Sequence, residues 1–313
     1  MCEHRSPVAD GSSCSRTRRV STRSSRSRRM VGLPAMLLAA LAALLSAGCR
    51  KAVEHVPEVV VIHAALPSDP SDAAWALVPI HDEPLLLQDL VEPRLLTPST
   101  GTVQIQSVTD GARVAFRIAW TDPTNDDLPG DARFSDACAV QLPARIEADL
   151  PAPQMGEPGK TVEITYWRAF WQATVDGRKD SINAIYPGAA VGHYPFDAAS
   201  LVPGSEAQRD MERRYAPARA LGNEMGGPRR TPVEDLVATG PGSLRPAPKS
   251  VSEGRGRRTE SGWAVVMSRP LPEGLRAGAR TQVAFAVWQG GSGEVGSRKM
   301  RSAWVPLTVK GGA

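Results

Sequence analysis

Two residues with chemically versatile side chains stand in unexpected places, Met155 in a turn and Lys299 at the end of a glycine-rich loop. Met155 lies in LPAPQMGEPGK (150–160), whose prolines and glycines are typical of a water-exposed turn. Methionine offers a polarisable thioether, and lysine a charge that burial can neutralise. Each residue alone also has an ordinary interpretation, because a turn methionine can cover a core edge and a loop lysine can be a solvated charge.

Histidines and carboxylates supply weaker candidates. The four histidines after residue 49 lie in dissimilar contexts without metal-ligand spacing: His55, His63, His81 and His193. His63 alternates within an expected strand, which favours a packed or surface histidine over a ligand. Asp122, Asp126 and Asp127 in DPTNDD could form a calcium loop, although acidic turns are usually only solvated. Because the sequence has no Ser/His/Asp arrangement, HExxH, P-loop or Rossmann glycine pattern, an independent hydrolase has no support.

The elements that must position these residues are strands. RVAFRIAW (113–120) alternates apolar residues with arginine and alanine, the period of a strand with one buried face. Similar patterns cover residues 58–64, 102–108, 136–142, 162–167, 262–269, 281–288 and 302–309. Clusters of turn residues separate them, so we expect an all-β fold, an antiparallel β-sandwich with short helical turns.

Helical signals are few. SDPSDAAWAL (68–77) predicts a short helical turn, and SEAQRDMERRY (205–215) a second helix. Residues 198–258 are rich in proline, glycine and arginine and show little alternation, so we expect a long irregular insertion there without a core strand.

The first residues predict an export signal over 1–49. A positive run precedes VGLPAMLLAALAALLSAGC, an apolar stretch that ends in small residues before Cys49. This ending is similar to a lipoprotein box, although Leu45 stands one place further from the cysteine than such a box requires. We expect a lipid on Cys49. A plain secretory signal, an uncut membrane anchor and a twin-arginine signal (SRRMVGL) are the alternatives.

Cysteine usage and charge narrow the possible functions of the remaining domain, residues 50–313. Cys138 is its only further cysteine, which excludes an internal disulfide, c-type haem attachment and a cysteine-ligated iron–sulfur cluster. The net charge of +4 owes much to the first thirty residues, so the rest is near neutral. A nucleic-acid partner is therefore not expected.

Several long motifs, in the same order, resemble a known family. They are ALPSDPSDAAWALVPIHDEPLLLQDLVEPR, FRIAWTDPTNDD, FSDACAVQLP, PQMGEPGKTVEITYWRA, GWAVVMSRPL and VAFAVWQGGSGEVGSRKMRSAW, running with gaps from about His63 to Val309. The chain resembles the haem b (gamma) subunit of the type II dimethyl-sulfoxide-reductase family, a cytochrome c-552/DMSO reductase-like haem-binding domain. This family includes the gamma subunits of ethylbenzene dehydrogenase, dimethylsulfide dehydrogenase, selenate reductase and chlorate reductase.

The resemblance implies a haem b held without covalent attachment at one end of the sandwich. The family's P-x-M-G methionine falls on Met155, and its loop lysine on Lys299, which makes these two residues the expected axial ligands of the haem iron. Methionine ligation favours Fe(II), and lysine must lose its proton to bind. Met300, Lys160 and Lys179 remain alternative ligands.

The resemblance also implies an electron-transfer subunit rather than a catalytic chain. It would relay electrons between the iron–sulfur subunit of a molybdenum oxidoreductase, whose molybdopterin subunit does the catalysis, and a c-type cytochrome or quinone-linked carrier. Together with the N-terminus, this implies a periplasmic lipoprotein anchored to the membrane surface. The alternative is a haem-free sandwich that binds carbohydrates or other ligands, with tryptophans as stacking platforms.

Overall fold

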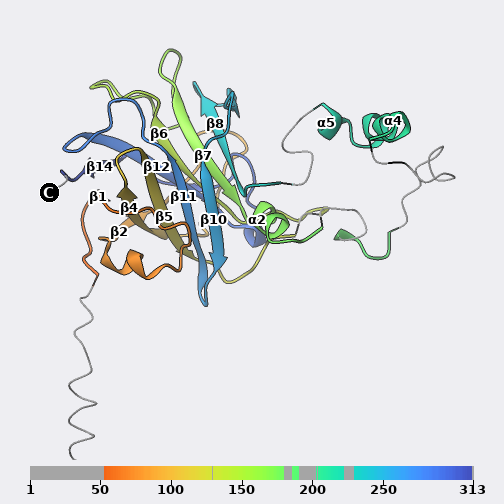
Figure 1. Ribbon diagram of the computed structural model, residues 1–313. Coiled ribbons are helices and arrows are strands. Elements are labelled where there is room, and N and C mark those ends of the chain that lie inside the picture. The colour runs from red at the N-terminus through yellow and green to blue at the C-terminus, as the bar shows by residue number, and fades with distance from the viewer. Residues whose placement is uncertain are drawn as a thin grey trace, which may run out of the picture. The chain divides into compact units, whose positions relative to one another are not determined.

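The computed structural model describes residues 53–128, 130–179, 185–189, 202, 204–221 and 229–311. Strands dominate these residues, which confirms the expected all-β fold (Figure 1). The strands are β1 (Val59–His63), β2 (His81–Pro84), β3 (Leu86–Leu87), β4 (Thr102–Thr109), β5 (Arg113–Thr121), β6 (Ala137–Pro143), β7 (Val162–Arg168), β8 (Val233–Ala238), β9 (Arg245–Pro246), β10 (Glu253–Arg258), β11 (Gly262–Pro270), β12 (Arg280–Trp288), β13 (Met300–Arg301) and β14 (Val305–Val309).

The strands pair in the order β10–β11–β5–β4–β1–β14–β12–β6–β7–β8–β9, and β12 connects two layers. The first half of β12, Arg280 to Val283, pairs with β14, and the second half, Ala284 to Trp288, pairs with β6. The pairs between these strands are antiparallel except for those of β1, which runs parallel to both β4 and β14. A strand that changes partners midway joins the layers at one edge of the sandwich.

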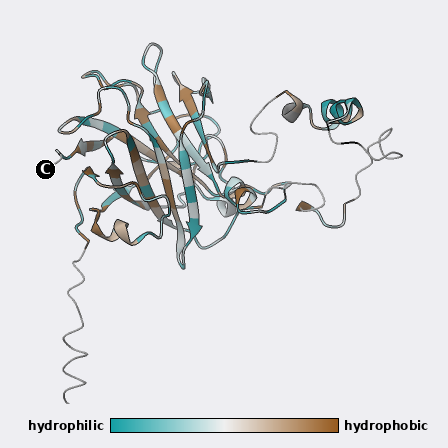
Figure 2. Ribbon diagram, viewed as in Figure 1, coloured by the Kyte–Doolittle hydropathy of each residue, from teal (hydrophilic) through white to brown (hydrophobic). Residues whose placement is uncertain are grey.

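The core lies between the two layers. Trp167 of β7 meets Trp263 of β11 edge to face, with ring centroids 5.1 Å apart. Phe116 of β5 meets Phe285 of β12 in the same way at 6.3 Å. Such aromatic pairs add to the stabilisation from buried area alone. Figure 2 shows the hydrophobic residues spread along the strands of both layers.

The expectation that residues 198–258 contain no core strand is wrong, because β8 and β10 both belong to the sheet. Polar residues hide the pattern of β8: Asp235 is buried, yet it accepts hydrogen bonds from Ser252 and Thr165. Glycines hide the pattern of β10. A Cβ atom at Gly254 or Gly256 would collide with neighbouring side chains, so the inner face of this strand shows no apolar period.

The described helical elements are short: η1 (Ala73–Leu77), α2 (Ala169–Val175), α4 (Glu206–Tyr215), α5 (Pro217–Ala220) and η4 (Gly290–Ser292). The helical turns predicted over 68–77 and 205–215 are confirmed as η1 and α4. Asp72 and Ser205 cap their N-termini with side-chain oxygens, as such residues commonly do. In the described part of the chain, no helix combines the length and apolarity needed to cross a bilayer.

Candidate functional site

The layer made by β6, β7 and β12 carries apolar residues on both faces. On the inner face, residues such as Cys138 and Phe285 pack into the core. On the outer face, Ala139, Ile164 and Ala286 line a cavity of about 500 Å³. Successive residues of a strand point to opposite faces, so the same strands build the core and the cavity. A concave, mainly apolar surface of this size is typical of a ligand site.

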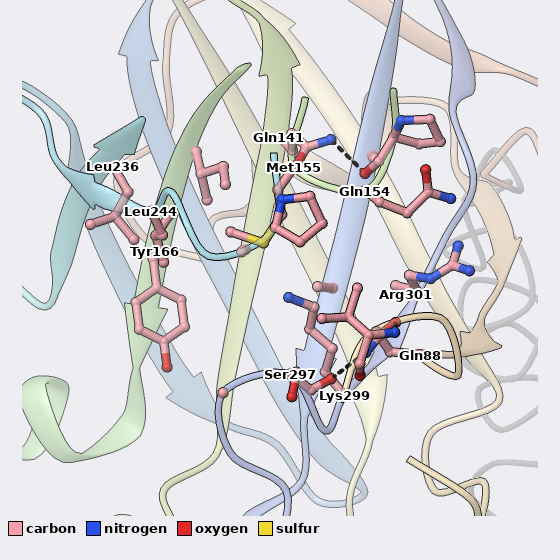
Figure 3. Close-up of a pocket in the computed structure, with 18 of the residues that line it drawn as sticks. Gln88, Gln141, Gln154, Met155, Tyr166, Leu236, Leu244, Ser297, Lys299 and Arg301 are labelled. Carbon is pink, nitrogen blue, oxygen red and sulfur yellow. Dashed lines mark hydrogen bonds between the residues drawn. The ribbon is translucent and has the colours of Figure 1, made fainter. Parts of the chain in front are cut away.

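Small side chains keep the middle of this outer face open. Ala286 of β12 pairs with Ala139 of β6, and Ala139 pairs with Tyr166 of β7. Trp288 and Tyr166 meet edge to face with ring centroids 5.2 Å apart. The two alanines therefore form the floor of the cavity, and the two aromatic rings form part of its wall. Figure 3 shows Tyr166 at one side of the cavity.

Met155 lines the cavity from the turn that precedes β7. Its φ of 67° places it in the left-handed region, which is uncommon for a residue with a Cβ atom. Gly156 follows with φ of 81°, and a Cβ there would lie 2.7 Å from the carbonyl oxygen of Lys160. Only glycine fits that position. Backbone strain like that of Met155 persists where the surroundings impose it, and it clusters at ligand sites.

Hydrogen bonds from three separate segments hold the methionine turn. Gln141 of β6 donates its Nε2 to the carbonyl oxygen of Pro153 at 3.0 Å. The Gly240 N–H donates to the carbonyl oxygen of Met155 at 2.8 Å, and the Trp304 indole donates to the start of the turn at 2.7 Å. The thioether is thus presented by a turn anchored to the sheet.

Lys299 lies across the cavity from Met155, at the end of the loop between η4 and β13 (Figure 3). Its Nζ lies 4.9 Å from the centre of the Trp288 ring, and no ion pair joins it to a carboxylate of the described residues. Burial, with a smaller contribution from the charge of Arg301, lowers the pKa of Lys299 to about 8. Such a lysine loses its proton more readily than a solvated one, as a metal-binding amine must.

Buried carboxyl groups attach the loop that carries Lys299 to the core. Asp136 accepts from the Gly290 N–H and from the Trp263 indole, both at 2.9 Å. Glu294 accepts from the backbone N–H at the start of the loop at 2.9 Å. Burial raises the pKa of both carboxyl groups, that of Asp136 to about 7. Asp136 therefore links the start of the loop to Trp263 of β11, and Glu294 closes the loop on itself.

The alternative ligands lie elsewhere. Met300 faces the core and is 2% exposed. Lys160 forms ion pairs with two acidic residues, and neither it nor the exposed Lys179 lines the cavity. Met155 and Lys299 thus line one cavity, and none of these three residues lines it.

The remaining sequence candidates also lie apart from the cavity. His55 and His81 contact carboxylates at β2, and His63 ends β1. Asp122, Asp126 and Asp127 give no metal site, because no group of three or more potential His, Cys, Asp or Glu ligands exists within the described ranges. His193 and Cys49 fall outside those ranges.

Sequence reasoning missed several residues that shape the cavity. Trp288 and Tyr166 were expected only as strand residues, and Gln88 and Arg301 were not singled out. One signal was available in VAFAVW (283–288), where both alternating sets of residues are apolar. A strand whose outer face meets water usually carries polar residues there, so this pattern indicates that both faces are covered.

Residues 72–300 match the profile of the family described as ethylbenzene dehydrogenase. The chain is 26% identical over 257 residues to a putative respiratory nitrate reductase haem subunit of Haloferax mediterranei, covering 80% of this chain and 71% of that protein. It is 23% identical over 269 residues to the chlorate reductase gamma subunit of Ideonella dechloratans, covering 83% and 87%.

Solved structures similar to this chain include a family 9 carbohydrate-binding module from Caldicellulosiruptor kristjanssonii in complex with glucose. The TM-score is 0.37 with 8% identity, covering 83% of this chain and 97% of that one. A putative carbohydrate-binding protein from Bacteroides uniformis gives 0.38 with 7% identity, covering 82% and 99%.

Proposed function

The chain belongs to the ethylbenzene dehydrogenase family, and from this premise we propose that it is an electron-transfer subunit that binds one haem b without covalent attachment. Two similar proteins are named as a haem subunit and a gamma subunit of reductases, which supports a haem-carrying rather than a catalytic role. The observation that carries the proposal is the single cavity lined by both Met155 and Lys299.

The residues present fit a haem. The cavity is mainly apolar, as a porphyrin requires, and two candidate donors face it from different segments of the chain. Met155 sits in a strained turn that the surrounding sheet holds in place. Among the described residues Lys299 has no carboxylate partner, and burial lowers its pKa to about 8. We therefore assign Met155 and Lys299 as the residues that would hold the haem iron.

The chemistry of the two ligands suits electron transfer. When bound, haem iron supplies a one-electron redox couple. The Met155 thioether is a soft, neutral donor that favours the ferrous state, and the Lys299 amine binds only in its neutral form. Because neither ligand adds negative charge, the reduction potential is expected to be high. With both residues bound to the iron, no position would remain for a substrate.

The position of the chain in its complex follows from this role. We propose that it relays electrons between the iron–sulfur subunit of a molybdenum oxidoreductase and an external carrier, a c-type cytochrome or a quinone-linked protein. The molybdopterin subunit would perform the catalysis. Export through residues 1–49, lipid on Cys49, a folded domain over 50–313 and a periplasmic location at the membrane surface remain predictions, because the described residues begin at 53.

Optical spectroscopy of the full-length chain tests the haem assignment. We expect a Soret band and, on reduction, sharp α and β bands. Met155→Ala and Lys299→Ala should each shift these bands and weaken haem binding, because each removes one axial ligand. Lys160→Ala is the matched lysine control and Met300→Leu the matched methionine control, and both should leave the spectrum unchanged.

Two outcomes would contradict the assignment in different ways. Unchanged spectra in both alanine variants, with a changed spectrum in either control, would show that other residues bind the haem iron. A colourless protein that takes up no haem and binds a sugar instead would favour the haem-free ligand-binding alternative.

A further inference from the structure

Polar and apolar residues occupy different ends of the cavity. In Figure 3, Tyr166 and Leu236 lie at one end, and Arg301 and Gln154 lie at the other. The two proposed iron ligands stand between these ends. The cavity therefore has a polar end and an apolar end, and the two candidate iron donors face its centre.

Strand register explains this polarity. Arg301 of β13 pairs with Ala286 of β12. Ala286 pairs in turn with Ala139 of β6, which pairs with Tyr166 of β7. Residues directly opposite in neighbouring strands point to the same face, so these residues form one row across the cavity floor. Three strand spacings make the row about 14 Å long, with a cation at one end and an aromatic ring at the other.

Arg301 has hydrogen-bond donors that no group of the described chain satisfies. Its Nε is buried without a partner. One Nη donates to the carbonyl oxygen of Ser302 at 3.4 Å, a long contact, and Arg301 joins none of the ion pairs formed by the described residues. A buried guanidinium donor without an acceptor is costly, so an acceptor supplied by a ligand is expected opposite it.

Other charged residues of the described lining are not available for this role. These are Glu92 and Lys299. Glu92 lies at the exposed rim and pairs with Arg94 at 2.7 Å. Lys299 is the proposed iron ligand, which binds as a neutral amine. Arg301 is therefore the cation that remains for a negatively charged part of the ligand.

We infer that Arg301 binds a haem propionate and thereby sets which edge of the porphyrin faces which end of the cavity. The inference rests on the proposed function, because the haem supplies the carboxylate. Haem b carries both carboxylates on one edge and apolar substituents elsewhere. The propionate edge lies at Arg301, and the apolar edge lies against Tyr166 and Leu236. Arginine suits this contact, since its planar donors can engage both oxygens of a carboxylate.

The test compares haem b with its dimethyl ester, in which both propionates are esterified and uncharged. Each porphyrin is titrated into the haem-free full-length chain, and the Soret band reports binding. Arg301→Gln should weaken haem binding about tenfold or more while changing ester binding less than about threefold, because only haem carries the charged partner. The reduced α band should stay in place, since both iron ligands remain.

Two further variants sharpen the test. Arg298→Gln removes a neighbouring arginine that also has an unpartnered Nε but does not line the cavity, so it should affect neither porphyrin. Arg301→Lys keeps the charge and should restore part of the preference for haem over the ester. Ester binding by each variant also shows that the protein is folded.

The outcomes separate this inference from the proposed function. If Arg301→Gln weakens the binding of haem and of the ester equally, or weakens neither, the propionate contact is wrong while the haem site stands. If the unmodified chain binds neither porphyrin, the proposed function itself is wrong and the inference falls with it.

Discussion

The two faces of the layer formed by β6, β7 and β12 are built from alternating residues of the same strands, yet only one face is filled. The inner face carries Val140, Phe285 and Val287, which pack against the opposite layer. The outer face carries Ala139 and Ala286 at the corresponding positions and leaves a cavity. At these positions both faces are apolar, so they differ there in the volume of the side chains rather than in polarity.

This difference separates residues that stabilise the fold from residues that make room for a ligand. A filled apolar face contributes its stabilisation as soon as the chain folds. An open apolar face gives up part of that stabilisation until something occupies it. Neighbouring residues of one strand should therefore respond to substitution in opposite ways, and Phe285 with Ala286 is the clearest such pair.

Truncation on the filled face should have the largest effect on stability. Phe285 is 2% exposed and contacts Phe116 edge to face. Phe285→Ala should lower the free energy of unfolding of the haem-free protein by about 3–5 kcal/mol, because it removes a buried ring and leaves a void. Denaturant unfolding followed by tryptophan fluorescence measures this change. A loss below about 1 kcal/mol would show that the inner face is not closely packed.

Filling the open face should have the next largest effect, and on ligand binding rather than on folding. Ala286→Trp places an indole on the cavity floor, where haem is proposed to lie. We expect haem affinity to fall at least a hundredfold, about 2.7 kcal/mol. The free energy of unfolding of the haem-free protein should change by no more than about 1 kcal/mol, since the cavity has room for the ring.

A tryptophan elsewhere on the same strand provides the control. Gln282 lies on β12 four residues before Ala286, in the same alternation phase but outside the cavity lining. Gln282→Trp should leave haem affinity unchanged. Undiminished haem binding by Ala286→Trp would mean that haem occupies a different site. The outer face of β12 would then not be a haem-binding surface.

Strands of both layers could be predicted from sequence, and the alternation of apolar and polar residues is plainest in RVAFRIAW (113–120) of β5. Prediction failed for β8 and β10, where alternation in hydropathy is lost. In β8 a buried carboxyl group, Asp235, is satisfied by hydrogen bonds from other segments. In β10 the inward positions are glycines that make room for large neighbours such as Trp167. Both segments form strands because of contacts with distant parts of the chain, and the residue pattern of neither segment reveals those contacts.

The site, too, could be predicted from sequence only in part. Met155 and Lys299 were predicted through a family resemblance, and their spacing of more than a hundred residues gave no sign that they would share a cavity. Register between β13, β12 and β6 places Arg301 beside the alanine floor. A single sequence does not reveal strand register between distant segments, so the polarity of the cavity could be recognised only in the structure.

Asp136 connects the two faces, since its carboxylate accepts from the Trp263 indole in the core and from Gly290 in the loop before Lys299. Burial is the main cause of its raised pKa, about 7, and the nearby charge of Asp122 contributes. An unfolded aspartate has a pKa of about 3.9. Between these values the folded chain holds more protons than the unfolded chain, so the contribution of Asp136 to stability falls as the pH rises.

The smallest predicted effect is therefore a change in the pH dependence of stability. From about pH 4 to about pH 7, this one group should lower the free energy of unfolding by at most about 1.4 kcal/mol per pH unit, and the slope should level off above pH 7. Asp136→Asn should remove this pH-dependent part of the free energy of unfolding. The altered hydrogen bonds can also change the stability at every pH, but such a change does not alter the slope.

Denaturant unfolding of the haem-free protein at pH 5, 6, 7 and 8 measures the slope, with exposed Asp89→Asn as control. Equal slopes in all three proteins would mean that Asp136 stays charged when buried. The loop that carries Lys299 would then be held to the core by the same ionised contact throughout this range.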